Sequence, residues 1–484
     1  MRTVLDLPRL IAPSRIPETR RLIVVSNREP YTLKKTGRTW VYQRTIGGLV
    51  SALDLVLRVT KGTWISWGGA EGYSFSGGGE DQLEAAGKPP YRLASVDRSE
   101  KQVEHFYEGY ANGQLWPLFH SFLERCHFNR EDWSYYKLVN QKFAAAAEKL
   151  ARPGDLLWIH DYQLCLVPQL VRAKRHRQKI GFFCHIPFPP PEIFRALPQR
   201  KDILRGLLGS TVIGFQGERD RKNFLESVQA LLPGEAQIRS DTIYVADHDC
   251  RVIACPIGID FLFYKSLAES HAAEVKAREL KKEINCRFIG LGVDRQDYSK
   301  GIHQRLLAVE RFLEKHPAYR KHLVFLQIMV PSRAHLPEYQ ALKSDIELAV
   351  GRINGKFQDR TWSPILYYYH GFTPNELAAF YRLADFALVT PLKDGMNLVA
   401  KEYAACSVKN SGSLILSEFT GSAEQLKEAW LVNPHDIEGV ADTIYRVLTE
   451  PKPEVEQRMA ALRQGIRQQD IHWWVQTFLR ELLA

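Results

Sequence analysis

Short apolar runs alternate with segments of helical spacing along most of the chain. The runs lack an alternation of apolar and polar positions, which is typical of strands buried on both faces of a parallel sheet. Alternating strands and helices predict an α/β protein whose ligands bind at the carboxyl ends of the strands. The expected strands are Leu22–Ser26, Leu156–Ile159, Ile180–Cys184, Val212–Phe215, Val252–Cys255, Phe288–Val293, Leu323–Val330, Ile365–Tyr369, Phe386–Thr390 and Leu414–Ser417.

These strands are too many for one small doubly wound domain. We expect a boundary near Pro256-Ile257-Gly258, which gives an N-terminal domain of residues 1–258 and a C-terminal domain of residues 259–465. Residues 466–484 carry the spacing of one apolar helix face, and we expect this helix to pack back on the N-terminal domain. The apolar face consists of Ile471, Trp474, Val475, Phe478, Leu479 and Leu482.

The composition is that of an ordinary globular protein, since 45% of the 484 residues are hydrophobic and 25% are charged. No apolar run reaches the roughly 18 to 20 residues of a membrane span, and the N-terminus lacks the apolar core of a signal peptide. The odd count of seven cysteines argues against a set of disulfides and favours the reducing cytoplasm.

The charge balance is less ordinary, because 65 Lys and Arg against 55 Asp and Glu give a net charge of +10. Such an excess suits nucleic acid, an anionic membrane or an anionic small molecule. No nucleic-acid-binding module and no metal-site spacing is present, so we expect no nucleic acid, no membrane, no metal and no cofactor. The basic run 172–179 we expect at the solvated end of a helix.

The segment Val293–Gly301 ends a strand and opens a helix. Arg295 and Lys300 can therefore approach one anion beside a helix N-terminus. A diphosphate fits this pair, because Arg offers a planar fork and Lys a point charge. A capped helix with surface charges is the alternative, which explains Asp297 but not two cations at the positive end of the helix dipole.

The segment Thr390–Glu402 has the same strand-to-helix form. The first N–H groups of its helix, at Asn397 and Leu398, are free to bind phosphate oxygens. Asp394 at the turn can accept from sugar hydroxyls, and Glu402 one turn later can accept from ribose hydroxyls.

Strand ends in the N-terminal half carry further polar residues. Arg28 comes two residues after the first strand. His160 and Asp161 follow the second strand, and His185 follows the third. A single histidine at a strand end is usually a packing residue, but two such histidines with an aspartate favour a functional site. Arg333 is one more cation at a strand end, so the chain carries enough positive charge for two phosphorylated ligands.

Several longer motifs occur together between about residues 21 and 478. They are Ser-Asn-Arg (26–28) with Gly47-Gly48, Trp-x-x-Trp (64–67), Leu-Trp-Pro-Leu-Phe-His (115–120), His-Asp-Tyr (160–162), His-Ile-Pro-Phe-Pro (185–189), Gly-Phe-Gln (214–216), Asp-Tyr-Ser-Lys-Gly (297–301) and Asp-Gly-Met-Asn-Leu-Val-Ala-Lys-Glu (394–402). In this combination the chain resembles the trehalose-6-phosphate synthase family, glycosyltransferase family 20.

The resemblance implies a GT-B fold, in which two Rossmann-like domains with parallel sheets face an inter-domain cleft. The N-terminal domain would bind the acceptor and the C-terminal domain the nucleotide sugar. It also implies a metal-independent, retaining transfer of glucose from a nucleotide sugar, UDP-glucose being the expected donor, to glucose 6-phosphate. The product would be trehalose 6-phosphate, on which a separate phosphatase would act. Cations at the leaving diphosphate are the main catalytic need of such a reaction, and no protein nucleophile is assigned.

The resemblance also implies roles for single residues. The catalytic residues would be Arg295, Lys300, Asp161, His185 and Asp394. The donor would contact Gly48, His185, Arg295, Lys300, Phe372, Asp394, Asn397, Leu398 and Glu402. The acceptor would contact Arg28, Trp67, Tyr107, Trp116, Asp161, Tyr162, Gln216 and Arg333.

Two departures from the family pattern leave the acceptor open. Gln163 stands where the family usually has histidine, and a long basic-aromatic loop separates Arg28 from Gly47. Arg-Glu-Pro-Tyr at 28–31 is similar to the glucosylglycerol-phosphate synthases, whereas Gln216 and Arg333 follow the trehalose type. The alternatives are therefore a glucosylglycerol-phosphate synthase or a related sugar-phosphate glycosyltransferase and, in another class, a catalytically inactive regulatory paralogue. The donor nucleotide (UDP, ADP or GDP) and assembly as a homo-oligomer also stay open.

Overall fold

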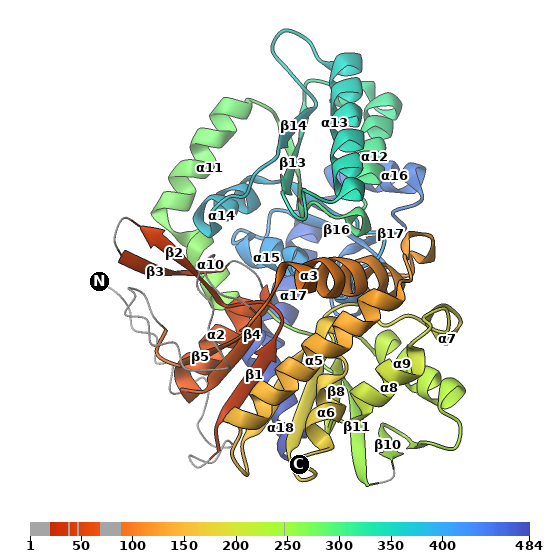
Figure 1. Ribbon diagram of the computed structural model, residues 1–484. Helices are drawn as coiled ribbons and strands as arrows, with labels where there is room; N and C mark the ends of the chain where they lie inside the picture. The colour runs from red at the N-terminus through yellow and green to blue at the C-terminus, as the bar shows by residue number, and fades with distance from the viewer. Residues whose placement is uncertain (1–19, 37–38, 46–47, 68–88, 246) are drawn as a thin grey trace. The chain divides into compact units, whose positions relative to one another are not determined.

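The computed structural model describes residues 20–36, 39–45, 48–67, 89–245 and 247–484. The chain divides into two compact units (Figure 1). The first comprises Met1–Pro256 with His472–Ala484, and the second comprises Ile257–Ile471. No helix in the described ranges combines the length and the apolar character needed to cross a bilayer.

Within the described residues, the sheet of the first unit has nine strands. Its first seven strands are parallel, and a short antiparallel hairpin extends one edge. The strand order reverses between the first strand of the chain and its neighbour β6, which is where ligands bind in open α/β sheets. Across the sheet the strands are β5 (Arg92–Val96), β4 (Thr63–Trp67), β1 (Leu22–Ser26), β6 (Leu156–His160), β7 (Lys179–Phe183), β8 (Val212–Phe215), β11 (His248–Ala254), β10 (Thr242–Val245) and β9 (Gln237–Arg239).

Helices connect these strands. They are α2 (Gly48–Thr60), α3 (Glu100–Gln102), η1 (Val103–Leu115), α4 (Trp116–Phe119), η2 (Leu123–Arg125), α5 (Arg130–Leu150), η3 (Tyr162–Leu164), α6 (Val167–Arg172), α7 (Pro191–Phe194), α8 (Arg200–Leu208), α9 (Glu218–Leu231) and α18 (Ile471–Leu483). The segment expected as a loop between Arg28 and Gly47 is instead an antiparallel pair, β2 (Tyr31–Thr36) and β3 (Thr39–Arg44).

The last helix, α18, packs against the middle of the first unit's sheet. The ring of Phe478 stacks on Trp158 of β6 with centroids 4.6 Å apart and planes 8° from parallel. Gly181 of β7 allows this approach, because a Cβ there would lie 2.6 Å from Cε1 of Phe478. An apolar helix face thus covers a sheet face that would otherwise be exposed to water.

A π-helix, η1, precedes α4 in the first unit. Asp132 of α5 fixes both ends of it, since Oδ1 lies 2.9 Å from Nδ1 of His105 and Oδ2 accepts from Nε2 of Gln114 at 3.3 Å. The hydrogen bond to Asp132 raises the pKa of His105. π-Helical turns are rare and occur mostly at functional sites. This one carries the predicted acceptor residue Tyr107.

Within the described residues, the sheet of the second unit has six parallel strands, and its order also reverses between the first strand and the fourth. Across the sheet they are β14 (Ile365–Tyr368), β13 (Leu323–Val330), β12 (Phe288–Arg295), β15 (Phe386–Val389), β16 (Ser413–Ser417) and β17 (Trp430–Val432). The helices are α10 (Phe261–Glu269), α11 (His271–Ile284), η4 (Tyr298–Lys300), α12 (Ile302–Lys315), η5 (Pro317–Tyr319), α13 (Pro337–Phe357), α14 (Pro374–Leu383), α15 (Leu398–Cys406), η6 (Gly421–Glu424), α16 (Ile437–Thr449) and α17 (Lys452–Gln468).

The second unit is a three-layer sandwich. Figure 1 shows α11 and α14 on one side of β13 and β14, and α12 and α13 on the other. The strands between them are buried, as in β13, where seven of eight residues have the buried pattern. The predicted α/β architecture is confirmed, and each of the ten expected strands corresponds to a strand of the structure. Four of them were expected to end one residue later than the observed β7, β11, β14 and β15 do.

One surface prediction is wrong. Arg172, the first residue of the basic run, is 5% exposed rather than solvated. Its guanidinium donates to the carbonyl oxygens of Gly209, His176 and Gln178 at 3.0, 2.6 and 2.8 Å. Buried backbone carbonyls need a hydrogen-bond donor. Arg172 supplies one to each of these three carbonyls and so holds the chain segments around them together. Spacing alone does not distinguish this from a solvated cation.

Candidate functional site

Two loops of the second unit meet at a buried ion pair. Nζ of Lys300, in the loop after β12, donates to Oδ2 of Asp394, in the loop after β15, at 2.6 Å. Nδ2 of Asn397 donates to the same oxygen at 3.1 Å. Three predicted donor residues from two strand ends are thus in direct contact, at the point where the strand order reverses.

The backbone beside this pair is packed too closely for a side chain at Gly301. Gly301 has a φ of +63°, and a Cβ there would lie 2.3 Å from the carbonyl oxygen of Thr390. Behind it, the fully buried Arg305 of α12 donates to Oγ1 of Thr390 at 3.0 Å and to the carbonyl oxygen of Lys300 at 3.3 Å. The same guanidinium pairs with Asp294. Arg305 therefore ties the two loops together, a role that its place in an ordinary helical pattern did not reveal.

The N-terminus of α15 faces the same loop. Asn397 caps it in a left-handed conformation with φ of +69°, and its Oδ1 accepts from the backbone N–H of Ala400 at 3.3 Å. Among the described residues, the backbone N–H groups of Asn397 and Leu398 have no acceptor. Uncapped N–H groups at the positive end of a helix are suited to bind an anion.

Arg295 differs from Lys300 in its surroundings. It ends β12 with an exposed side chain, and in the described part of the chain it has no hydrogen-bond or ion-pair partner. One cation of the predicted diphosphate pair is therefore held in place, and the other is available to a ligand.

Glu402 lies one turn into α15. Its carboxylate accepts from Oη of Tyr264 at 2.9 Å and from Oη of Tyr381 at 3.0 Å. Burial raises the pKa of Glu402, while the two hydrogen bonds lower it. Neither tyrosine belonged to the predicted site, because both occur in ordinary helical patterns.

The two remaining predicted residues of this unit follow the neighbouring strands. Phe372 follows β14 and packs edge-on against Phe380 with ring centroids 4.9 Å apart. Arg333 follows β13 with a φ of +49°; its guanidinium donates to Oη of Tyr339 and lies 3.8 Å from Oδ2 of Asp297. Arg333 belongs to the second unit, although its predicted acceptor partner Arg28 belongs to the first.

In the first unit, Asp161 is held at the carboxyl end of β6. Its φ of +76° is uncommon for a residue other than glycine. The conformation is kept by hydrogen bonds to Oδ1 from the backbone N–H groups of Tyr162, at 3.1 Å, and His185, at 3.2 Å. Strained backbone of this kind clusters at functional sites. The ends of β6 and β7 are thereby joined.

Two histidines face each other beside Asp161. Nδ1 of His160 lies 3.1 Å from Nε2 of His185, and Nε2 of Gln216 lies 3.5 Å from the other ring nitrogen of His185. Burial lowers the pKa of His185 to about 3 and that of His160 well below its usual value. Because their lowered pKa values leave both rings neutral at pH 7, one of the two facing nitrogens donates an N–H hydrogen bond and the other accepts it.

The predicted acceptor residues form an aromatic cluster in the same unit. Trp67 lies 6.2 Å from Tyr107, and Trp116 lies 5.7 Å from Tyr162, measured between ring centroids. Asn112 joins the two pairs, since its Nδ2 donates to the carbonyl oxygen of Tyr107 at 2.7 Å and its Oδ1 accepts from Oη of Tyr162 at 2.8 Å. The sequence did not reveal Asn112, because its contacts with Tyr107 and Tyr162 depend on the geometry of the π-helix.

Two other predicted residues of this unit lie after β1 and at the start of α2. Arg28 is exposed directly after β1, where Oγ of Ser26 donates to its carbonyl oxygen at 2.8 Å. Gly48 is the first residue of α2, and its neighbour Gly47 lies outside the described residues. The first unit thus brings together Asp161, Tyr162, His185 and Gln216, with the aromatic cluster beside them.

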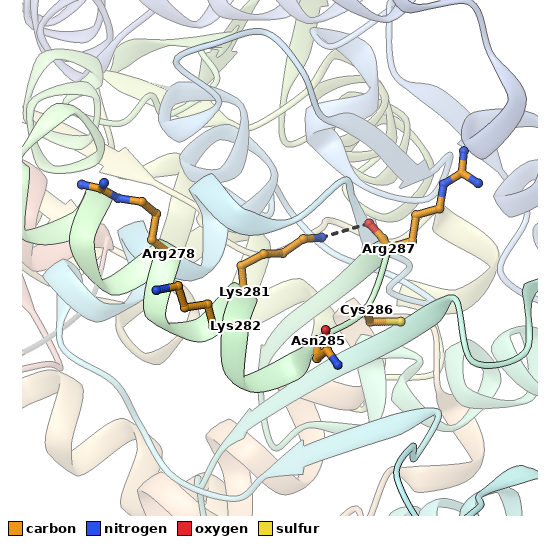
Figure 2. A pocket seen from close by; sticks show the side chains of 6 residues that line it. All are labelled: Arg278, Lys281, Lys282, Asn285, Cys286 and Arg287. Atoms are coloured by element: carbon orange, nitrogen blue, oxygen red, sulfur yellow. Dashed lines mark hydrogen bonds between the residues drawn. The ribbon is translucent and has the colours of Figure 1, made fainter.

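A surface hollow of about 490 Å³ lies elsewhere on the second unit, at the end of α11. Figure 2 shows that its cations point apart, with the Arg287 guanidinium directed away from Lys282 and Arg278. Nζ of Lys281 is occupied by the carbonyl oxygen of Arg287 at 2.9 Å. Diverging cations do not form a site for one anion, and the lining includes none of the predicted residues.

Comparison with known proteins agrees with this arrangement. The chain matches glycosyltransferase family 20 over residues 20–484. It is 41% identical over 479 residues to the trehalose-6-phosphate synthase of Mycolicibacterium smegmatis, covering 97% of this chain and 93% of that one. It is 40% identical over 476 residues to the bifunctional trehalose-6-phosphate synthase/phosphatase of Thermoproteus tenax, of which it spans 64%.

Solved structures are similar over nearly the whole chain. The E. coli protein bound with UDP-2-fluoro glucose superposes with a TM-score of 0.87 at 35% identity, covering 96% of this chain and 99% of that one. The α,α-trehalose-phosphate synthase (UDP-forming) of Burkholderia xenovorans in complex with glucose 6-phosphate gives 0.86 at 34% identity, covering 96% and 100%. The predicted GT-B fold is confirmed by this match and by the two sheets. The chain belongs to glycosyltransferase family 20, the family of the trehalose-6-phosphate synthases.

Proposed function

We propose that this protein transfers glucose from UDP-glucose to glucose 6-phosphate, with retention of the anomeric configuration, and releases trehalose 6-phosphate and UDP. Identity of about 40% to synthases over nearly the full chain supports this reaction. So do the structural relatives solved with UDP-2-fluoro glucose and with glucose 6-phosphate. The single observation that carries the proposal is the contact of Lys300 with Asp394 beside the N–H groups of Asn397 and Leu398, which have no acceptor among the described residues.

This group of residues suits the leaving diphosphate. As the glycosidic bond breaks, negative charge grows on the diphosphate while the sugar becomes positively charged. Lys300, Arg295 and the N–H groups of Asn397 and Leu398 would stabilise that charge. Because Lys300 and the N-terminus of α15 are already in place, they would stabilise the negative charge of the leaving diphosphate without a rearrangement of the protein. Phe372, Glu402 and Gly48 would complete the donor site.

His185 and Asp394 would bind hydroxyls of the donor glucose. The low pKa of His185 keeps its ring neutral, so it would act as a hydrogen-bond partner rather than as a cation or a proton donor from imidazolium. Asp161, fixed by two backbone N–H groups, would orient the acceptor. No side chain is assigned as a nucleophile, and the leaving phosphate would take the acceptor's proton.

The acceptor would be held by polar and aromatic residues of the first unit together with Arg333. Trp67, Tyr107, Trp116 and Tyr162 offer flat apolar surfaces with polar edges, which suit a sugar ring. Gln216, buried beside His185, would add an amide. Arg28 and Arg333 would clamp the sugar phosphate, for which the guanidinium fork is suited.

The cellular setting is part of the same proposal. We place the protein in the cytoplasm, where its seven free thiols would stay reduced. Its partners would be small anionic substrates, with a separate phosphatase acting on the product. Nucleic acid and membranes would have no role.

A matrix of donors and acceptors tests the reaction. UDP-, ADP- and GDP-glucose are each combined with glucose 6-phosphate and with glycerol 3-phosphate, and nucleotide release is measured. We expect turnover with UDP-glucose and glucose 6-phosphate, with an α,α-linked product by NMR. Turnover with glycerol 3-phosphate as the acceptor, and none with glucose 6-phosphate, would identify a glucosylglycerol-phosphate synthase. Release of nucleotide from none of the pairs would favour a regulatory role.

A further inference from the structure

A carboxylate in the second unit is held by two tyrosines from two other helices. Oη of Tyr264 on α10 donates to Oε1 of Glu402, and Oη of Tyr381 on α14 donates to Oε2. The three helices α10, α14 and α15 pack against one another. With one donor on each oxygen, both the position and the rotation of the carboxylate plane are fixed.

The bonding leaves part of the carboxylate unused. A carboxylate offers about four lone-pair sites, two on each oxygen. Each tyrosine occupies one site of one oxygen. Each oxygen therefore keeps capacity to accept one more hydrogen bond, and the two vicinal hydroxyls of a ribose can offer one donor to each oxygen.

The hydrogen-bond partners of Glu402 are neutral hydroxyl groups. Among the described residues, Glu402 is paired with no cation. A buried carboxylate that only stabilises the fold is usually neutralised by Arg or Lys, as Asp294 is by Arg305. Neutral hydroxyl donors fix the group but leave its charge, and a charged acceptor binds a further hydroxyl more strongly than a neutral one.

We propose that Tyr264 and Tyr381 are positioning residues that hold Glu402 for bidentate binding of the ribose 2′- and 3′-hydroxyls, and so set a preference for ribonucleotides over 2′-deoxyribonucleotides. This inference rests on the proposed function, because it requires a nucleotide at the second unit. Removal of either tyrosine hydroxyl frees the carboxylate to rotate, and the penalty then falls on the ligand that uses both of its oxygens.

The test is calorimetric binding of UDP and 2′-deoxy-UDP to the full chain. The wild-type protein is expected to bind UDP roughly 10- to 100-fold more tightly than 2′-deoxy-UDP, because the deoxy ligand lacks one hydrogen bond to a charged group. In Tyr264→Phe and in Tyr381→Phe that ratio falls by about fivefold or more, mainly through weaker UDP binding. Tyr264 is only half-buried, so its variant keeps the test available if Tyr381→Phe is unstable.

Tyr403→Phe is the matched control. Tyr403 is the residue after Glu402 on the same helix, is fully buried, and donates its hydroxyl to the carbonyl oxygen of Ala384 at 3.3 Å. Its variant loses a buried hydrogen bond and some stability but keeps the wild-type ratio. A ratio that falls equally in Tyr403→Phe would show a general effect of packing and overturn the inference.

The remaining outcomes separate this inference from the proposed function. Tight UDP binding with an unchanged ratio in both tyrosine variants would overturn the inference alone. Tight UDP binding by the wild-type protein with no preference over 2′-deoxy-UDP would do the same. Absence of UDP binding by the wild-type protein would overturn the proposed function, and the inference with it.

Discussion

Nζ of Lys300 lies 2.6 Å from Oδ2 of Asp394, and this contact joins the loops that follow β12 and β15. Lys300 is 8% exposed, whereas Arg295 at the end of β12 is exposed and has no partner within the described residues. The two cations predicted to bind one diphosphate therefore differ in what else depends on them. Lys300 therefore has a structural role in addition to its proposed binding role, whereas for Arg295 only the binding role is proposed.

Arg295→Ala is expected to lower kcat by about 100- to 1000-fold, the effect of removing one preorganised donor from a developing charge. Because Arg295 has no hydrogen-bond or ion-pair partner among the described residues, the melting temperature of this variant is expected to stay that of the wild type. Lys300→Ala is expected to lower both kcat and the melting temperature, because the buried Asp394 carboxylate loses the cation that is paired with it. Arg360→Ala, another exposed arginine of the second unit, serves as the control. Activity retained in the Arg295→Ala, Lys300→Ala double variant would mean that the diphosphate binds elsewhere.

Gly301→Ala is expected to destabilise the second unit by about 2 kcal/mol or more, since the new Cβ meets the Thr390 carbonyl oxygen and the φ is positive. Urea unfolding measures the change, and activity falls with it. Gly351→Ala is the matched control, because that glycine lies in α13 with open space around it. This substitution is expected to stabilise the helix by about 0.5–1 kcal/mol. Equal effects of the two substitutions would contradict the account of Gly301.

The buried histidine pair predicts a dependence of stability on pH. Burial lowers the pKa of His185 to about 3 and holds that of His160 well below its usual value, whereas both would titrate near about 6.5 in the unfolded chain. Below that pH the unfolded chain binds protons that the folded chain cannot. Stability is therefore full above pH 6.5 and is lost as the pH falls toward 3, by up to about 1.4 kcal/mol per pH unit for each histidine.

Urea unfolding between pH 7.5 and 4.5 checks this slope. His185→Gln, which cannot titrate, is expected to unfold with a shallower dependence on pH. The control His271→Gln changes an exposed histidine at the start of α11 and is expected to keep the wild-type slope. A wild-type slope in His185→Gln would show that this ring is protonated in the folded state.

Asn112→Ala is expected to raise KM for glucose 6-phosphate by about 5- to 10-fold, because it removes the hydrogen bonds that align Tyr107 and Tyr162. UDP binding stays unchanged, since none of the predicted donor residues contacts this asparagine. Steady-state kinetics with each substrate varied in turn separate the two effects. Asn223→Ala, which removes a 2.7 Å hydrogen bond to Phe188 in the same unit, controls for the general loss of an amide. A change in UDP affinity in Asn112→Ala would refute the role.

Phe478→Ala is expected to lower the free energy of unfolding by about 3–5 kcal/mol, because it leaves a cavity between α18 and the sheet beside Gly181. Leu348→Ala on α13, where the side chain is 74% exposed, should change it by less than about 0.5 kcal/mol. Chemical denaturation of both variants gives the comparison. A small effect at Phe478 would show that the last helix contributes little to the first unit.

The apolar pattern predicted the strands that are buried on both faces, because these have continuous apolar runs. It missed β4 and β5, in which apolar residues are mixed with Thr, Ser and Arg, the three-residue β17, and the short edge hairpin of β9 and β10. It also took β2 and β3 for a loop. The motif positions at strand ends were correctly placed at the carboxyl edges of the two sheets. Their assigned roles with substrates stay predictions.

The amino-acid sequence by itself determined the two-sheet α/β fold and which polar residues follow the strands, because both depend on short-range spacing. Only the tertiary structure decided which of these residues touch. Lys300 is paired with Asp394, whereas Arg295 has no partner in the part of the chain that the structure describes. Arg172 is a buried clamp, and Glu402 is held by Tyr264 and Tyr381. These contacts join residues as many as 138 positions apart, and a pairing over that distance is set by how the helices pack rather than by any local pattern.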